Sequence, residues 1–242
     1  MASSLRYAKP MVFPPSGRHT ATVIFAHGLG DSGHGWASAV EHWRRRQRLD
    51  EVKFILPHAP SIPISVNGGF QMPGWFDIFQ LGGSVEELRK KAATEDGPGI
   101  LASREYFNNL IQEEISAGIP SERIVLGGFS QGGAMSILTG VTSPVKLGGI
   151  IGLSSWLLLS QSVKEHIPES NPNKDTPIFM GHGDQDPVVR YELGSESSRI
   201  LKDLGYNVDL NTYRGMEHSA CLEELDEVEK YLVERLPAKG NN

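Results

Sequence analysis

Short apolar runs recur along the chain, and most precede a segment in which apolar residues repeat with helical spacing. The runs are ATVIFA (21–26), VKFIL (52–56), RIVLGGF (123–129), GGIIGLSSW (148–156), TPIFMG (176–181) and VDLNTY (208–213). Helical patterns fit 35–48, 100–117, 131–141, 190–204 and 221–235. Apolar strands that alternate with amphipathic helices are typical of a parallel sheet with helices on both faces. The pattern therefore predicts the α/β class.

Two segments break this alternation. SIPISVNGGFQMPGWFDIFQL (61–81) has neither strand nor helix periodicity, and its aromatic residues argue against disorder, so we predict a functional loop. A short helix is expected from a capping box at Ser84, and the charged stretch after it ends in DGPG (96–99). We interpret 80–99 as a surface excursion and 237–242 as a flexible tail. With neither an internal repeat nor a linker, the pattern predicts a single domain over 1–242.

Composition and charge narrow the function classes. Hydrophobic residues make up 39% of the 242 residues and charged residues 21%, which suits one sizeable core. The formal net charge of −6 argues against a broad phosphate-binding surface, so nucleic acid is not an expected partner. The one basic cluster, RRRQR (44–48), is interpreted as a solvated helix face, with contact to acidic headgroups as the alternative.

Cys221 is the only cysteine, which excludes an intrachain disulfide and a paired-cysteine metal site and favours a reducing compartment. The N-terminal residues show neither a signal-peptide pattern nor a myristoylation start. No segment approaches eighteen consecutive apolar residues, so no transmembrane segment is expected. We expect a soluble protein of the cytoplasm, with the nucleus as a second compartment.

The segment GFSQG (128–132) has the form G-x-S-x-G. Short motifs of this kind also occur by chance, so the context decides. Ser130 lies where a predicted strand meets a predicted helix that begins at Gln131, which is the setting of a nucleophile elbow. Glycines on both sides permit the tight turn that such a serine needs. We therefore favour a nucleophile over a capping serine in a glycine-rich turn.

A serine nucleophile requires a base and an orienting carboxylate, here expected in the chain order Ser, Asp or Glu, His. His182 and His218 both follow Ser130 near strand ends, and His218 also follows a suitable carboxylate, so it is the predicted base. For the carboxylate, Asp184 and Asp186 remain equal candidates at this point. His182 with the two aspartates also suggests a metal site, which we disfavour because no further ligand cluster supports it.

A second glycine-rich loop, HGLGDSGHGW (27–36), follows the first strong strand. It lacks the spacing of phosphate-binding loops. Its glycines would let a backbone N–H approach a substrate carbonyl, and the N–H of Gln131 would be the second donor of an oxyanion hole.

Six segments together carry a more specific resemblance: HGLGDSGHGW (27–36), PHAP (57–60), MPGWFDI (72–78), GIPSERIVLGGFSQGGA (118–134), HGDQDP (182–187) and GMEHSAC (215–221). Over nearly its whole length the chain resembles the acyl-protein thioesterase and lysophospholipase family of the α/β-hydrolase superfamily. The resemblance implies the α/β-hydrolase fold, with Ser130 as nucleophile, His218 as general base and then acid, and Asp186 as orienting carboxylate. It also implies that Leu29 and Gln131 supply the oxyanion-hole N–H groups.

The resemblance further implies a hydrolase that removes long fatty acyl groups from S-acylated cysteines of membrane-associated proteins. Lysophospholipids and simple acyl esters are expected as additional substrates, and no metal or organic cofactor is implied. The alternative within the same class is a general carboxylesterase for short soluble esters. A binding protein that has lost catalysis is disfavoured because every triad position is intact. We expect a monomer or a weak homodimer.

A long acyl chain needs an apolar trench beside the serine. The candidate residues are Met72, Trp75, Phe76, Ile78, Trp156 and Leu157, with ordinary core packing as the alternative for each. The chain departs from the family pattern in two ways. The excursion 80–99 is longer than the corresponding family segment, and no cysteine is present near the N-terminus for acylation of the enzyme itself.

Overall fold

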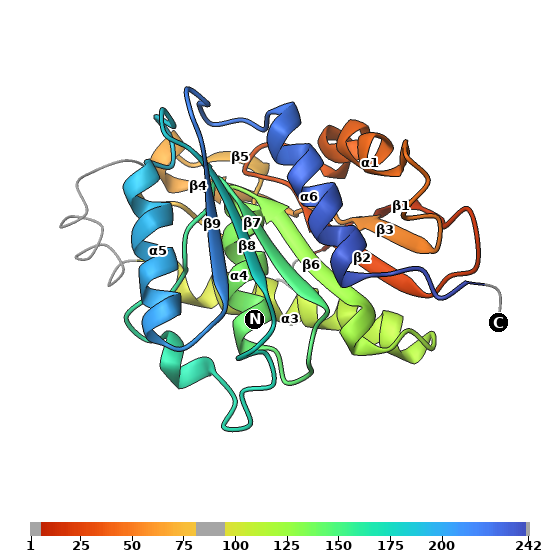
Figure 1. Cartoon of the computed structure of the whole chain (residues 1–242). Coiled ribbons are helices and arrows are strands. Elements are labelled where there is room, and N and C mark those ends of the chain that lie inside the picture. Colours follow the sequence, from red (N-terminus) through yellow and green to blue (C-terminus); the bar gives the residue numbers. More distant parts are fainter. Residues whose placement is uncertain (1–5, 81–94, 241–242) are drawn as a thin grey trace.

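A central sheet dominates the computed structural model, which describes residues 6–80 and 95–240 (Figure 1). The strand order is β1-β3-β2-β6-β7-β8-β9. The strands are β1 (Met11–Phe13), β2 (Ala21–Ala26), β3 (Val52–Leu56), β6 (Ile124–Phe129), β7 (Gly149–Leu153), β8 (Ile178–Gly183) and β9 (Val208–Tyr213). β1 is antiparallel to β3, and the other neighbouring pairs are parallel. The predicted mostly parallel sheet is confirmed.

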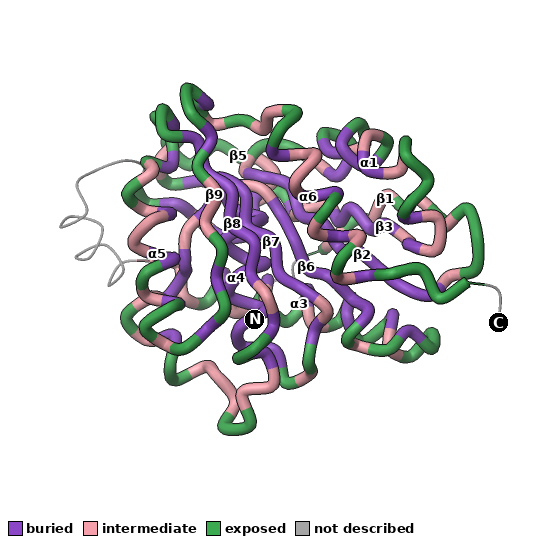
Figure 2. Tube along the Cα trace, in the orientation of Figure 1, coloured by how far each residue is buried: buried purple, intermediate pink, exposed green. Residues whose placement is uncertain are grey.

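Helices cover both faces of the sheet. α1 (Ala37–Arg44) and α6 (Leu222–Arg235) lie together on one face, and α3 (Gly97–Ser116), α4 (Gln131–Thr142) and α5 (Tyr191–Asp203) pack on the other (Figure 1). Four short 3-10 helices are described: η1 (Gly33–Trp36), η2 (Ser65–Asn67), η3 (Ser121–Arg123) and η4 (Val163–His166). Figure 2 shows that β2, β7 and β8 are buried along their whole length. Full burial explains why their sequences are apolar at successive positions.

The sequence placed three strands at their observed bounds, namely β2, β3 and β9. The predicted strand 148–156 is too long at its end, because β7 stops at Leu153. Ser154, the next residue, has φ +44°, and this left-handed conformation turns the chain out of the sheet.

The prediction that 61–81 lacks regular structure is wrong for its first part. β4 (Ser61–Ile64) and β5 (Phe70–Pro73) form an antiparallel hairpin. Gly68 and Gly69 turn the chain between them with φ of +67° and +80°. Each strand has only four residues, two of them exposed, so neither shows an apolar periodicity. The NGG sequence (67–69) was the available signal, since such dipeptides favour hairpin turns.

The predicted helix and excursion fall largely outside the described residues, whereas most of the predicted tail lies within them. The helix expected at Ser84 and most of the excursion 80–99 lie in 81–94, and the predicted tail 237–242 is described to residue 240. There the backbone N–H groups of Lys239 and Gly240 donate to the carboxylate of Glu51. Within the described ranges, every helix is too short or too polar to cross a bilayer.

Candidate active site

Ser130 lies on a sharp turn between β6 and α4. Its backbone has φ +52° and ψ −121°, a conformation that L-residues rarely adopt. A Cβ at Gly128 would lie 2.5 Å from the carbonyl carbon of Gly132, and one at Gly132 would lie 2.3 Å from the backbone oxygen of Ala26. The neighbouring backbone leaves no room for a side chain at either position, so both residues must be glycine. The Ser130 N–H donates to the Leu153 carbonyl at 2.8 Å and ties the turn to β7.

A chain of two hydrogen bonds joins Ser130, His218 and Asp186. The Ser130 Oγ lies 3.0 Å from Nε2 of His218, and Nδ1 of the same ring lies 2.7 Å from Oδ2 of Asp186. The three residues follow β6, β9 and β8, whose carboxyl ends share one edge of the sheet. A carboxylate can only accept, so Nδ1 carries the ring hydrogen and Nε2 accepts from the serine hydroxyl. This arrangement can withdraw a proton from Ser130.

The structure separates the two aspartates that the sequence left open. The side chain of Asp186 is fully buried, and its Oδ1 accepts from the N–H groups of Val188 and Val189, each at 2.9 Å. Burial acts to raise its pKa, but the hydrogen bond and charge of His218 and these two N–H groups outweigh it and hold the pKa below its ordinary value. Asp184 is exposed and accepts from the Gly215 N–H at 2.6 Å. Asp184 thus braces the turn that carries His218.

His182 packs behind this loop, with its ring 3.5 Å from Oδ2 of Asp186. Its Nε2 lies 2.7 Å from the Val189 carbonyl, which can only accept, so this nitrogen carries a hydrogen. The ring is buried, and burial lowers its pKa. A Cβ at Gly194 would lie 2.4 Å from Nδ1, so α5 packs directly on the ring. A neutral His182 therefore supports the loop that holds Asp186.

The predicted oxyanion loop passes close to the serine. A Cβ at Gly28 would lie 3.2 Å from the Cβ of Ser130. The Asp31 N–H donates to the Gly28 carbonyl at 3.3 Å, and Gly30 has φ +80°, as the third residue of a type II turn requires. Leu29 lies within this turn.

Gln131 is the first residue of α4, where a backbone N–H has no partner within the helix. Its buried side chain has a further function that the sequence did not reveal. Oε1 accepts from the Trp75 N–H at 2.8 Å, and Nε2 donates to the Phe76 carbonyl at 2.7 Å. The side chain thereby fixes the segment 74–77 beside the serine turn. The oxyanion role of the Leu29 and Gln131 N–H groups stays a prediction.

The six predicted acyl-binding residues lie on two segments, the part of the chain from β5 to Ile78 and the part that follows β7. Trp75 is 1% exposed, and its Nε1 donates to the His27 carbonyl at 2.8 Å. Phe76, Ile78 and Leu157 are also buried, whereas Met72 and Trp156 are partly exposed. In this conformation Trp75 belongs to the core, and acyl binding stays a prediction for the whole set.

Glu95 is a further residue near this region that the sequence did not single out. Its carboxylate accepts from the Leu159 N–H at 2.8 Å and from the side chain of Trp156. Burial raises its pKa to about 7. The charged stretch 87–99 was predicted to be an exposed excursion, and Glu95 departs from that prediction because it is partly buried against the segment after β7. No local pattern could indicate this contact.

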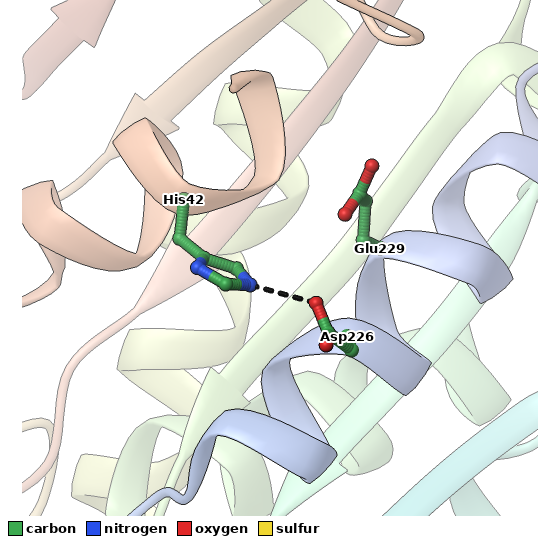
Figure 3. A group of neighbouring side chains, drawn as sticks. All are labelled: His42, Asp226 and Glu229. Carbon is green, nitrogen blue, oxygen red and sulfur yellow. Dashed lines mark hydrogen bonds and ion pairs between the residues drawn. The ribbon is translucent and has the colours of Figure 1, made fainter. Parts of the chain in front are cut away.

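A group of three potential metal ligands lies elsewhere in the described part of the chain, on α1 and α6 (Figure 3). His42 Nε2 lies 2.9 Å from Oδ1 of Asp226, and Glu229 is one turn further along α6. Arg46 pairs with both carboxylates, and Arg48 pairs with Glu229 at 2.7 Å. Two guanidinium groups already neutralise these ligands and would repel a cation. The basic cluster, predicted to be a solvated face, thus also clamps α1 to α6.

Comparison with known proteins identifies close relatives. The model of the phospholipase/carboxylesterase family matches residues 7–235. Acyl-protein thioesterase 1 of Neurospora crassa is 63% identical over 235 residues, which cover 97% of this chain and 95% of that protein. Acyl-protein thioesterase 1 of Gibberella zeae is 63% identical over 231 residues, with coverage of 96% and 97%.

A solved structure extends this likeness to the fold. The crystal structure of acyl-protein thioesterase 2 of Zea mays matches with a TM-score of 0.81 at 32% identity, and the match covers 95% of this chain and 100% of that chain. Together with the family match, this result confirms the α/β-hydrolase fold that the sequence motifs implied.

Proposed function

The chain belongs to the phospholipase/carboxylesterase family, and we propose that it is an acyl-protein thioesterase. Its reaction is the hydrolysis of long-chain fatty acyl thioesters on S-acylated cysteines of proteins, with lysophospholipids and simple esters as further substrates. The observation that carries the chemistry is the hydrogen-bonded chain from Ser130 through His218 to Asp186. The thioesterase relatives, which align over nearly the whole chain at 63% identity, support the substrate class.

The first half of the reaction forms an acyl-enzyme. The Ser130 Oγ attacks the thioester carbonyl carbon while His218 Nε2 takes the hydroxyl proton. Asp186 stabilises the imidazolium that results and keeps its hydrogen on Nδ1. The carbonyl oxygen becomes an oxyanion and accepts from the N–H groups of Leu29 and Gln131. Collapse of this intermediate breaks the carbon–sulfur bond, and His218 gives its proton to the departing thiolate.

The second half releases the fatty acid. Water enters the place of the thiol, His218 takes a proton from it, and the hydroxide attacks the acyl carbon. The same two N–H groups receive the second oxyanion. When this intermediate collapses, the proton returns from His218 to the Ser130 oxygen. The products are a free cysteine thiol on the substrate protein and a fatty acid.

The experiment that tests this function is a comparison of kcat/KM on matched thioesters and oxygen esters with acyl chains of two to sixteen carbons. Ser130→Ala serves as the blank. We expect kcat/KM to rise with chain length and the rise to persist on S-acyl peptides, because each methylene buried in the enzyme adds about 0.8 kcal/mol. A maximum at two to four carbons would identify a carboxylesterase for short esters instead.

We also propose that the enzyme acts in the cytoplasm as a monomer or a weak homodimer. The single cysteine supports the compartment, because it suits a reducing environment. Sedimentation velocity over a range of protein concentrations tests the oligomeric state, and a stable dimer at the lowest concentration would contradict it.

A further inference from the structure

His27 is a buried histidine of the oxyanion loop that the reaction scheme does not use. Its ring is 0% exposed, and both ring nitrogens are engaged. Nε2 lies 3.0 Å from the backbone nitrogen of Ala59, and Nδ1 lies 2.7 Å from the carbonyl oxygen of Gly28. The Ala59 N–H can only donate, so Nε2 is the acceptor and the ring hydrogen is on Nδ1. Nδ1–H therefore donates to the Gly28 carbonyl.

This bond fixes the orientation of one peptide group. The Gly28 carbonyl and the Leu29 N–H belong to the same planar trans peptide and point in opposite directions. A donor that holds the carbonyl on one side therefore directs the N–H to the other side. The Asp31 N–H also donates to the Gly28 carbonyl, but at 3.3 Å it is the weaker of the two restraints on this peptide. Gly28 lies against Ser130, so the orientation of this peptide matters at the nucleophile.

The ring itself is held from several directions. It follows β2 directly, and its centroid lies 5.2 Å from that of Trp75. The Trp75 Nε1–H donates to the backbone carbonyl of His27 at 2.8 Å. Burial lowers the pKa of His27, which keeps Nε2 unprotonated and able to accept from Ala59. The contacts around His27 therefore select the tautomer that carries its hydrogen on Nδ1.

We propose that His27 is a positioning residue that fixes the Gly28–Leu29 peptide so that the Leu29 N–H donates to the oxyanion. The inference rests on the proposed function, since it concerns the same site. Without the Nδ1 donor, the peptide can rotate and present its carbonyl oxygen, which repels the developing negative charge. Loss of a whole oxyanion donor costs about a hundredfold to a thousandfold in kcat. A donor that is present but poorly oriented should cost less, about 30-fold.

Two amide variants distinguish the effects of the two hydrogen bonds that the His27 ring makes. The amide nitrogen of an asparagine occupies nearly the place of Nδ1, so His27→Asn keeps a donor for the Gly28 carbonyl and loses the acceptor for Ala59. The amide oxygen of a glutamine reaches nearly to Nε2, so His27→Gln keeps the acceptor and loses the donor. Both variants lose the ring and a similar amount of packing, so each controls for the stability loss of the other.

We expect His27→Gln to lower kcat on a long-chain thioester about 30-fold with little change in KM, and His27→Asn to lower it less than fivefold. The inhibition constant of a trifluoromethyl ketone with the same acyl chain should rise in parallel with the loss of kcat, because this inhibitor forms a tetrahedral oxyanion on the serine. Binding of a thioether analogue that lacks the carbonyl should not change. Equal losses in both variants, or losses that follow their melting temperatures, would overturn the proposal.

The wild-type protein supplies a test that does not depend on a folded variant. Nitrogen-15 spectra of labelled histidine report which ring nitrogen carries the hydrogen, and we expect Nδ1–H for His27. An Nε2–H tautomer would refute the proposal. Wild-type protein that hydrolyses short esters but no long-chain thioester would refute the proposed substrate class alone, since the same variants can then be compared on the ester.

Discussion

The backbone of Ser130 combines strain with function at a single residue. Its φ of +52° with ψ of −121° suits glycine, and such conformations cost about 1–3 kcal/mol in other residues. The hydrogen bonds of its N–H to Leu153 and of its carbonyl to the Ala134 N–H hold the turn in place. The strain presents the hydroxyl to His218 at the edge of the sheet.

This strain predicts an order of stability among variants of Ser130. Both Ser130→Ala and Ser130→Gly remove the hydroxyl, but only glycine relieves the strain. We expect Ser130→Gly to melt about 2–4 °C above Ser130→Ala, since about 1 kcal/mol remains after the greater freedom of glycine in the unfolded chain is subtracted. Thermal denaturation followed by circular dichroism measures the difference. A melting temperature of Ser130→Gly equal to or below that of Ser130→Ala would show that the strain is no larger than the cost of glycine's freedom in the unfolded chain.

The two aspartates after β8 predict unequal effects on catalysis. Asp186→Asn removes the charge that holds the Nδ1 hydrogen of His218 and should lower kcat about 10⁴-fold. Asp184→Asn keeps an oxygen for the Gly215 N–H and should lower kcat less than about threefold. Steady-state kinetics on a simple ester compare them. Similar losses in the two variants would contradict the assignment of the carboxylate.

Glu224 predicts a dependence of stability on pH. Its side chain is buried, and neither carboxylate oxygen has a hydrogen-bond partner among the described residues. Burial, and then the charge of Glu227, raises its pKa to about 8, whereas an unfolded glutamate titrates near about 4.3. Between these values the folded state holds the proton and the unfolded state does not. Stability should therefore fall as the pH rises from about 4.3 to about 8.

A Glu224→Gln variant tests this linkage because glutamine resembles the protonated carboxyl group and does not titrate. We expect the variant to gain about 3–4 kcal/mol relative to the wild type between pH 5 and pH 8. Chemical denaturation at both pH values measures the gap. A constant offset between the two proteins across this range would mean that Glu224 ionises normally in the fold.

At the scale of elements, α1 and α6 are joined by charge as well as by apolar packing. Glu229 on α6 has a fully buried side chain, and Arg46 and Arg48, which follow α1, are 50% and 44% exposed. The arginine stems cover the carboxylate while their guanidinium groups reach solvent. Trp43 adds a hydrogen bond from its Nε1 to the Leu225 carbonyl at 3.1 Å. The two helices therefore form a fixed layer on one face of the sheet.

This clamp predicts that Glu229→Gln lowers stability by about 2 kcal/mol and the melting temperature by about 6 °C, because two cations lose their partner. The gap from the wild type should shrink in 1 M NaCl, where exposed charges are screened. Zinc ions should leave both melting temperatures unchanged. A rise with zinc in the wild type that disappears in His42→Ala would instead identify the group in Figure 3 as a metal site.

At the scale of the whole molecule, the N-terminal segment reaches across to α3 and to Trp75. Tyr7 stacks on Tyr106 of α3 with ring centroids 3.7 Å apart and nearly parallel planes, and it also stacks on Trp75 at 6.5 Å. Trp75 in turn donates to the His27 carbonyl. Residues that are far apart in sequence thus support the predicted oxyanion loop through one aromatic stack.

This stack predicts that Tyr7→Ala lowers stability by about 2 kcal/mol and the melting temperature by about 5 °C. Tyr7→Phe is the matched control and should change the melting temperature by less than about 1 °C, since the hydroxyl makes only a long 3.4 Å contact with Ser103. Differential scanning calorimetry measures both variants. An equal loss in Tyr7→Phe and Tyr7→Ala would mean that the hydroxyl, not the ring, holds the segment.

The sequence by itself determined the sheet, its flanking helices and the residues that meet at the serine. Burial on both faces makes the inner strands mostly apolar, so their presence, though not always their bounds, is readable locally. Parallel strands end at one edge, so residues that follow β6, β8 and β9 had to converge there. The G-x-S-x-G motif also predicted the tight turn at Ser130. These features depend on local pattern and on one rule of topology.

Only the tertiary structure decided the remaining points, because they depend on contacts between distant residues. Local sequence leaves Asp184 and Asp186 equivalent. In the folded chain the loop after β8 places Asp186 beside His218, and Asp184 accepts from the Gly215 N–H instead. The contact of Glu95 with Leu159 spans 64 residues, and that of Arg46 with Glu229 spans 183. The tautomer of His27 follows from the Ala59 N–H, 32 residues away. A hydrogen bond selects a partner by position in space, and that position exists only once the chain has folded.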